Sequence, residues 1–233
     1  MKIIYIITGV SRGLGYYLVN EILSDNLSDN FVIGLSRSKS DLSEKFSANF
    51  EWIKTDLTKL NKVDSLVDCI VEKFSPDTIC FISNAGDVNP ISYIGEHKFE
   101  EINNSLSLNV TSPLIIINHI ISRYKSKKIA LVNITSSSSN KAIEGWSLYS
   151  SSKSYMKMYF DVLAIEQLQD DNASISVLQI DPGAMDTVMQ EEIRKTSIKS
   201  NQLKRLLEIH KNNMLSKPSD VAIKIYNQIA SFL

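Results

Sequence analysis

The stretch TGVSRGLG, residues 8 to 15, decides the fold of this chain. It follows the apolar run KIIYIIT (2 to 8) and leads into apolar residues at helical spacing, Leu14, Leu18, Val19, Ile22 and Leu23. A strand, a glycine-rich turn and an amphipathic helix in that order present free backbone amides and a positive helix end to an anion. A plain turn needs one glycine, whereas three of the chain's eight glycines lie here. The stretch therefore predicts a dinucleotide site.

Each glycine of this turn has a predicted task. Gly9 allows the tight turn, Gly13 lets a phosphate approach the backbone, and Gly15 lets the helix pack closely on the sheet. The spacing is GxxxGxG rather than GxGxxG. The residues predicted to surround the phosphates are Gly9, Ser11, Arg12, Gly13, Leu14 and Gly15.

The rest of the chain repeats the alternation of strand and helix. Further strand-like apolar runs occupy residues 31 to 36, 50 to 55, 78 to 83, 128 to 134 and 174 to 180, and a second helical pattern covers 63 to 71. Continuous apolar strands that alternate with helices are typical of a parallel sheet buried on both faces. We expect one Rossmann-type α/β domain over 1 to 233, a doubly wound parallel sheet with helices on both faces. Ligands of such sheets bind at the carboxyl ends of the strands.

Composition limits the class of partner. The chain has 25 basic and 26 acidic residues, so no nucleic-acid surface is expected. No apolar run reaches the roughly 18 residues of a membrane span, and the N-terminus lacks a signal-peptide pattern. Cys69 and Cys80 show no CxxC or zinc spacing, which favours buried, reduced thiols, and His97, His119 and His210 show no metal-ligand spacing. We expect a cytoplasmic protein that binds small molecules, has no membrane contact and has no metal site.

The end of the second predicted strand indicates which dinucleotide binds. NAD-binding proteins usually place an acidic residue there, but Ser36 and Arg37 stand in this chain and the first acid is Asp41. Arg12 approaches the same ribose from the glycine turn. One charge-assisted contact with a 2′-phosphate contributes roughly 1.5 to 3 kcal/mol, about ten- to a hundredfold in affinity. NADPH is the predicted cofactor, and two solvated surface arginines are the alternative.

A series of ordered motifs resembles the short-chain dehydrogenase/reductase family. The motifs are TGVSRGLG, Asp56-Leu57, SNAG at 83 to 86, Asn109, Ser136, Tyr149-xxx-Lys153 and PGAMDT at 182 to 187. Within that family, SNAGDVNPI, KAIEGWSLY and DPGAMDTVMQEEIRKTS resemble the benzil reductase branch, which is related to sepiapterin reductases. That branch implies reduction of one ketone of a 1,2-dicarbonyl or of a similar bulky ketone.

The resemblance also implies contacts for particular residues. Those implied to line the cofactor are Asp56 and Leu57 at the adenine, Asn84, Ala85 and Gly86 on the adenosine side, and Pro182, Gly183, Met185 and Thr187 at the nicotinamide. Asn109 would order a helix and a water that leads to Lys153. The helices after Asn109 and after Tyr149 would form the surface of a homodimer.

The chemistry of carbonyl reduction explains why a tyrosine and a lysine stand together. Hydride addition leaves an alkoxide that needs a proton, and a phenol with a pKa of about 10 is a poor partner near neutral pH unless it is tuned. Tyr149 and Lys153 fall at i and i+4 of a predicted helix, so the ammonium can stabilise the phenolate and reach the cofactor ribose. Ser136 can donate a hydrogen bond to the carbonyl oxygen as charge develops there.

The same YxxxK spacing occurs a second time, at Tyr124 and Lys128. Tyr124 precedes a predicted strand, on the side away from the expected crevice, whereas Tyr149 follows the carboxyl end of that strand. We therefore assign the acid to Tyr149 and predict that Tyr124 is an ordinary surface tyrosine.

Three features bear on the substrate. Trp146, Met185 and Met189 are candidates for the substrate pocket, with ordinary packing as an equal alternative. Residues 184 to 216 are polar and helical in pattern, which suits a lid over the substrate. The chain finishes at IYNQIASFL, a predicted helix, where the family usually adds a seventh strand.

The prediction from sequence is an NADPH-dependent carbonyl reductase with Tyr149 as general acid. One alternative is a 3-oxoacyl reductase or an alcohol dehydrogenase of the same family; a carrier-linked substrate would favour a basic patch at the pocket mouth. A catalytically silent NADP-sensing protein is a further alternative, and the presence of Ser136, Tyr149 and Lys153 argues against it.

Overall fold

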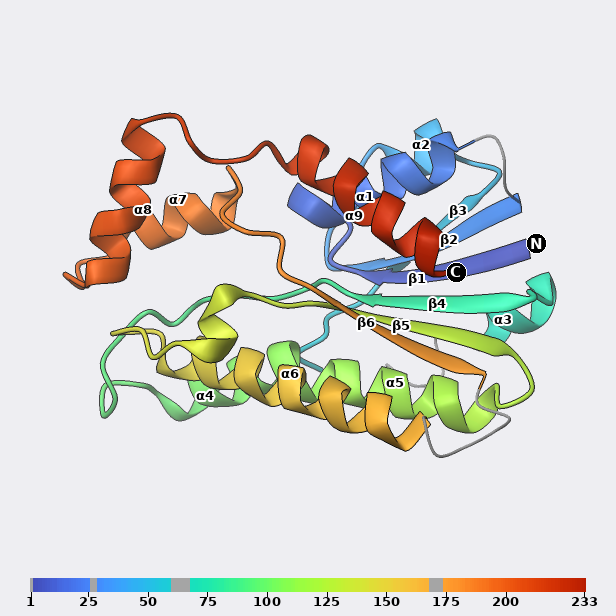
Figure 1. Ribbon diagram of the computed structural model, residues 1–233, viewed down its shortest axis with the longest axis horizontal. Coiled ribbons are helices and arrows are strands. Elements are labelled where there is room, and N and C mark those ends of the chain that lie inside the picture. The colour runs from blue at the N-terminus through green and yellow to red at the C-terminus, as the bar shows by residue number, and fades with distance from the viewer. Residues whose placement is uncertain (1, 26–28, 60–67, 168–173) are drawn as a thin grey trace.

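Six parallel strands form the sheet of the computed structural model, which describes residues 2–25, 29–59, 68–167 and 174–233 (Figure 1). The strands are β1 (Lys2–Thr8), β2 (Asp29–Ser36), β3 (Phe50–Lys54), β4 (Thr78–Ser83), β5 (Lys128–Ile134) and β6 (Ile175–Ile180). Their order, β3-β2-β1-β4-β5-β6, changes direction between β1 and β4, which is the point where such sheets bind ligands. The predicted Rossmann-type doubly wound sheet is confirmed.

The strands coincide with the predicted apolar runs because both faces of the sheet are buried. Along β1, Ile4 and Ile6 point into one core cluster, whereas Ile3, Tyr5 and Ile7 point into the other. Strands β4 and β5 alternate in the same way. Since successive side chains of a strand point to opposite faces, a strand covered on both faces is apolar at every position.

Helices cover both faces of the sheet (Figure 1). One layer contains α1 (Gly13–Ser24), α2 (Leu42–Lys45) and α9 (Pro218–Phe232), and the other contains α3 (Asp68–Phe74), α5 (Ser112–Arg123) and α6 (Ser147–Gln167). The helical pattern predicted over 63 to 71 falls largely on 60–67, outside the described residues, as does the side chain of Cys69. The predicted terminal helix is confirmed as α9.

A long interrupted helix lies in the second layer. Helix α4 (Phe99–Leu106) continues through a π-helical turn, η2 (Ser107–Thr111), into α5. By length and composition the segment Phe99–Arg123 could cross a membrane, but half of its most apolar window is buried. Ile116, Ile117 and Ile120 pack in the core of the domain, so this segment is a core helix.

Two helices extend past the carboxyl ends of the strands (Figure 1). They are α7 (Val188–Lys195) and α8 (Asn201–Lys211), both within the predicted lid segment 184–216. The two ends of that segment are joined, because Asp186 N donates to Ser216 O at 2.9 Å and Ser216 N donates to Ala184 O at 3.1 Å. Both ends of the segment thus connect to the domain at one place.

The middle of β2 has no room for a side chain beyond hydrogen. A Cβ on Gly34 would lie 2.6 Å from Val10 Cγ2 and 2.8 Å from the Phe50 ring, and both neighbours are buried. We expect Gly34→Ala to lower the free energy of unfolding by about 1–3 kcal/mol, the usual cost of overpacking. Urea unfolding followed by circular dichroism measures this loss.

The control for this substitution is Glu51→Ala, because Glu51 is exposed on the neighbouring strand β3. It should change stability by less than about 0.5 kcal/mol. Equal stability of Gly34→Ala and the unmodified protein would contradict the close packing described here.

Candidate active site

A cleft of about 770 Å³ opens at the carboxyl ends of the strands. Most of the predicted cofactor residues line it: Gly9, Ser11, Arg12, Gly13, Leu14, Ser36, Arg37, Asp56, Leu57, Asn84, Ala85, Gly86, Tyr149, Lys153, Pro182, Met185 and Thr187. Met189 lines it too. The other predicted site residues lie outside its described lining, namely Gly15, Asn109, Ser136, Trp146 and Gly183.

The glycine turn has the close contacts that a dinucleotide-binding turn needs. Gly9 has a φ of +76°, and a Cβ there would lie 3.0 Å from Ala85 Cα. A Cβ on Gly15 would lie 2.3 Å from the carbonyl oxygen of Gly9, so only glycine allows α1 to start this close to β1. Helix α1 begins at Gly13, and no side chain caps its first amides. These amides face the cleft and fit a pyrophosphate.

The end of β2 carries the predicted 2′-phosphate residues. Arg37 is exposed and lines the cleft. Ser36 is buried: its hydroxyl donates to Ser38 O at 2.9 Å and accepts from Trp52 Nε1 at 3.0 Å. Ser36 thus has no hydrogen left for a phosphate in this arrangement, and it holds the turn that presents Arg37.

Asp56, the residue expected at the adenine, lies in a local turn. Thr58 donates to Asp56 Oδ1 from its hydroxyl at 2.7 Å and from its amide at 3.1 Å. The hydroxyl bond lowers the pKa of Asp56, and the nearby charges of Lys59 and Arg37 act in the same direction. The carboxylate is therefore ionised at neutral pH and close to Arg37.

Asn84 and Thr8 join the ends of β4 and β1. Asn84 Nδ2 donates to Thr8 O at 2.8 Å and to Gly9 O at 3.3 Å. The Thr8 hydroxyl accepts from the amides of Asn84 at 3.0 Å and Ala85 at 2.9 Å. Asn84 thus lines the cleft and also holds the glycine turn in place.

Asn109 lies in the π-helical turn and is buried. Its Oδ1 accepts from Asp87 N at 3.0 Å, and its Nδ2 donates to Asp87 O at 3.0 Å and to Ser105 Oγ at 3.3 Å. A π-turn often marks a functional site. Here it brings Asn109 against Gly86, where a Cβ would lie 3.2 Å from Asn109 Oδ1 and 3.8 Å from Lys153 Nζ.

Tyr149 lies near the start of α6 and is 8% exposed. Burial raises the pKa of Tyr149 to about 12, a hydrogen bond with Ser136 lowers it, and the charges of Asp181 and Asp87 raise it. Ser136 follows β5 and caps the short η3 helix (Ser137–Asn140). The phenol is therefore fully protonated at neutral pH and next to the Ser136 hydroxyl.

Lys153 lies one turn after Tyr149 and is also buried. Its Nζ donates to Ile134 O at 2.8 Å and lies 5.8 Å from the centre of the Tyr149 ring. Burial lowers the pKa of Lys153 to about 8, opposed by the charge of Asp181. Lys153 thus points into the cleft from beside the phenol, and its tuning of Tyr149 stays a prediction.

An apolar cluster surrounds the phenol on the side of α7 and α8. Its buried members are Val88, Trp146, Tyr149, Ile193 and Leu206, with Ile91, Ile143, Ala184, Met189 and Leu203 packed against them. The Trp146 ring meets the Tyr149 ring edge-on, with the centres 5.8 Å apart. Asn89 Nδ2 donates to Glu192 Oε2 at 3.0 Å and so connects the loop after β4 to α7. The end of the cleft at Tyr149 is therefore bordered by apolar side chains.

Several lining residues were not predicted from sequence. They are Tyr17, Leu35, Ser38, Lys39, Thr55, Thr58, Leu108, Ile134, Thr135, Asp186, Val188, Glu191 and Pro218. Lys39 could have been predicted from the sequence, because it is a second cation two residues after Arg37. The others are scattered along the chain and reach the cleft only through the fold.

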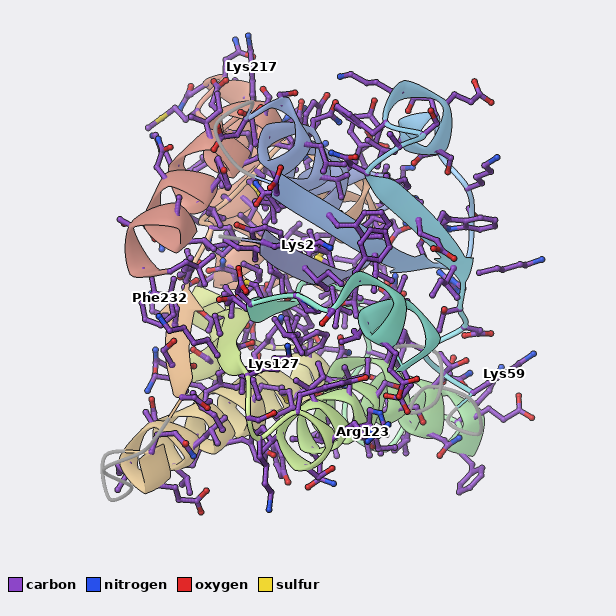
Figure 2. All side chains as sticks on the ribbon, turned by 90° about the vertical axis from the view of Figure 1, so that its right-hand side faces the viewer. Lys2, Lys59, Arg123, Lys127, Lys217 and Phe232 are labelled. Atoms are coloured by element: carbon purple, nitrogen blue, oxygen red, sulfur yellow. The ribbon has the colours of Figure 1, made fainter. Side chains whose placement is uncertain are left out.

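Tyr124 corrects one prediction. It is 8% exposed and packs in the core, so it is not a surface tyrosine. Its hydroxyl donates to Asp68 Oδ1 at 2.8 Å, and His119 Nε2 lies 2.7 Å from the same oxygen. Figure 2 shows the end of the sheet where the strands begin, with Arg123 and Lys127 there. Tyr124 therefore lies away from the cleft, as its position in the sequence indicated.

His97 and His119 make side-chain contacts within the fold. His97 lies 2.7 Å from Ser92 Oγ through Nδ1 and 3.0 Å from Ser147 Oγ through Nε2. Within the described ranges, no three His, Cys, Asp or Glu side chains gather as a metal site would require. Cys80 is a free, buried thiol.

Known proteins match this chain along most of its length. The family model described as short chain dehydrogenase matches residues 3–198. A benzil reductase ((S)-benzoin forming) of Bacillus subtilis (strain 168) is 32% identical over 225 residues, which cover 94% of this chain and 90% of that protein. A sepiapterin reductase of Bos taurus is 28% identical over 227 residues, covering 90% of this chain and 83% of the relative. The crystal structure of the KRED1-Pglu enzyme superposes with a TM-score of 0.84 and 26% identity, covering 97% of this chain and 94% of that one.

The contacts of Asn109 predict a structural cost for its removal. Asn109→Ala leaves the partly buried amide and carbonyl of Asp87 without these partners, so we expect a loss of about 1–3 kcal/mol in the free energy of unfolding. Asn104→Ala, on the exposed side of α4, is the matched control. Urea unfolding of both variants measures the difference, and equal stabilities would show that Asn109 does not hold the π-turn.

Proposed function

Because this chain belongs to the short-chain dehydrogenase family and is an oxidoreductase, we propose that it is an NADPH-dependent reductase of bulky ketones. One carbonyl of a 1,2-diketone is the proposed type of substrate, since a relative is a benzil reductase. The observation that carries the proposal is a buried, protonated Tyr149 beside Ser136, at the apolar end of a cleft that fits a dinucleotide.

Bound NADPH would supply a hydride to the carbonyl carbon, which leaves an oxyanion that takes up one proton. Tyr149 would donate that proton from its hydroxyl, which is protonated at neutral pH because burial raises the pKa of the phenol to about 12. Since such a phenol is a weak acid, the transfer would depend on stabilisation of the phenolate. Ser136 would donate a hydrogen bond to the developing oxyanion. Lys153 would remain mostly cationic below its pKa of about 8 and would stabilise the phenolate that the transfer leaves.

Asn109 and Lys153 both approach the place that a Cβ on Gly86 would occupy, and this supports a proton route from that region to Tyr149. Asn109 acts in this proposal by holding the helix and the Asp87 loop, since its amide is bonded to Asp87. Trp146 and Met189 would shape the substrate pocket from the apolar cluster. Segment 184–216 would act as a lid that excludes water from the reacting carbonyl.

The choice of NADPH rests on the cations at the end of β2. Arg37 and Lys39 line the cleft there, with Arg12 in the glycine turn. A 2′-phosphate brings about two negative charges, which these side chains would neutralise, whereas the NADH ribose offers a neutral hydroxyl.

Two observations weigh against the alternatives within the family. Asp186 and Glu191 line the cleft, and their charges disfavour the binding of an acidic carrier protein, which the 3-oxoacyl reductase alternative requires. Because its pKa is raised to about 12, the phenol is protonated at neutral pH, which is the form that donates a proton and not the form that removes one from an alcohol. Ser136, Tyr149 and Lys153 together argue against a silent NADP-sensing protein.

We also propose a cytoplasmic homodimer. The outer face of α6 exposes Tyr155, Met158, Val162 and Ile165, a stripe that a second copy would cover. The buried, unpaired thiol of Cys80 is compatible with a reducing compartment.

Tyr149→Phe tests the proposed acid. It keeps the ring against Trp146 and removes the proton donor, so turnover of NADPH with benzil should fall at least about 100-fold. NADPH binding, followed by its fluorescence, should be retained. Tyr155→Phe, on the exposed face of the same helix, is the matched control and should keep full turnover. Unchanged turnover in Tyr149→Phe would remove Tyr149 as the acid.

Arg37→Ala tests the proposed cofactor preference. Loss of one charge-assisted contact should weaken NADPH binding about ten- to a hundredfold and leave NADH binding nearly unchanged. Calorimetry with both cofactors measures the ratio. Arg123→Ala is the control, because Arg123 lies at the opposite end of the sheet (Figure 2). Equal affinities of the unmodified protein for the two cofactors would refute the 2′-phosphate argument.

A further inference from the structure

Ser138 lies in the middle of the serine run that follows β5, and its side chain turns back to Ser136. It belongs to the η3 helix and is 1% exposed. Its amide lies 3.2 Å from Ser136 Oγ, and its own hydroxyl oxygen lies 3.0 Å from the same atom. The amide and the hydroxyl of this one buried residue therefore both meet the hydroxyl of Ser136.

The contacts with Ser138 decide which hydrogen-bonding sites of the Ser136 hydroxyl remain available. A hydroxyl has one hydrogen to donate and two lone pairs that accept. The Ser138 amide can only donate, so it occupies one lone pair of Ser136, and the Ser138 hydroxyl donates to the second. The hydrogen of Ser136 is then left for a third partner, on the side of Tyr149.

We infer that Ser138 is a positioning residue, which fills both acceptor sites of Ser136 and thereby directs the Ser136 hydrogen to the carbonyl oxygen of the substrate. This inference rests on the proposed function, because it assigns a cause to the orientation of Ser136 in that reaction. Without Ser138, the Ser136 hydroxyl rotates among staggered positions and donates to the substrate in only some of them.

The neighbouring serines have different surroundings. Ser137 is exposed. Ser139 is buried at 8% exposure, and its carbonyl oxygen accepts from Ser154 Oγ at 2.7 Å. That bond fixes η3 against α6 through the backbone, so it survives a change of the Ser139 side chain. The run therefore offers an exposed control and a buried control beside the residue under test.

The experiment is a double-mutant cycle of Ser136→Ala and Ser138→Ala, with NADPH and benzil as probes. Ser138→Ala should lower kcat about tenfold. This loss is smaller than the roughly 100- to 1000-fold loss caused by removal of a direct oxyanion donor. The KM for benzil and the affinity for NADPH should stay within about twofold, because Ser138 acts on proton orientation rather than on binding. In the Ser136→Ala background, Ser138→Ala should have no further effect on kcat.

Further measurements distinguish a positioning role of Ser138 from an effect of its substitution on folding. NADPH deuterated at the transferred hydrogen should give a larger isotope effect on kcat in Ser138→Ala, because the chemical step becomes slower. Ser137→Ala and Ser139→Ala should keep the kcat and the isotope effect of the unmodified protein. Rates are expressed per NADPH-binding site, so a loss of folded protein does not count as a loss of kcat.

Three outcomes would overturn the inference. If Ser138→Ala keeps its kcat while Ser136→Ala loses kcat, Ser138 has no positioning role and the proposed function stands. An equal loss in both backgrounds would show that Ser138 acts through the fold and not through Ser136. A fully active Ser136→Ala would overturn both the inference and the role of Ser136 in the proposed function.

Discussion

The junction between β1 and β4 is the constraint on which the site depends. These adjacent strands send their following segments to opposite faces of the sheet, so those segments diverge and leave a crevice beyond the strand ends. Asn84 bridges that crevice, since its side chain donates to the carbonyl oxygens of Thr8 and Gly9. The Thr8 hydroxyl accepts from the amides on the β4 side. The glycine turn is therefore held open at a fixed place, where α1 begins and a phosphate can approach its amides.

The side chains of the proposed reaction lie close to this junction. Gly86, two residues after Asn84, has no Cβ and so leaves room for the side chains of Asn109 and Lys153. The π-turn places Asn109 there, and α6 places Lys153 and Tyr149. Burial then acts on the two titratable groups in opposite directions, because it disfavours the charged form of each. The phenol keeps its proton, and the ammonium is brought within reach of neutral pH.

Sequence patterns predicted the sheet better than the site. The strands β1, β4 and β5 have the bounds of their apolar runs, since burial on both faces requires apolar residues at each position and polar residues begin where burial stops. Most predicted cofactor residues line the cleft for a related reason: they follow directly after strands, and parallel strands end at one edge. Tyr124 shows where such reasoning fails, because its ring packs in the core and its hydroxyl bonds to Asp68 of α3, which is distant in sequence.

The sequence by itself determined the order of strands and helices, the edge of the sheet that carries the cleft, and which of the two tyrosines in a YxxxK pattern lies there. These properties follow from local periodicity and from the position of glycine and serine after each strand. Only the tertiary structure decided the partner of each polar group: Ser36 with Trp52, Lys153 with Ile134, and Ser136 with Tyr149. The physical reason is that hydrogen bonds need distances near 3 Å and suitable angles. Such geometry arises only after segments far apart in the chain have packed against each other.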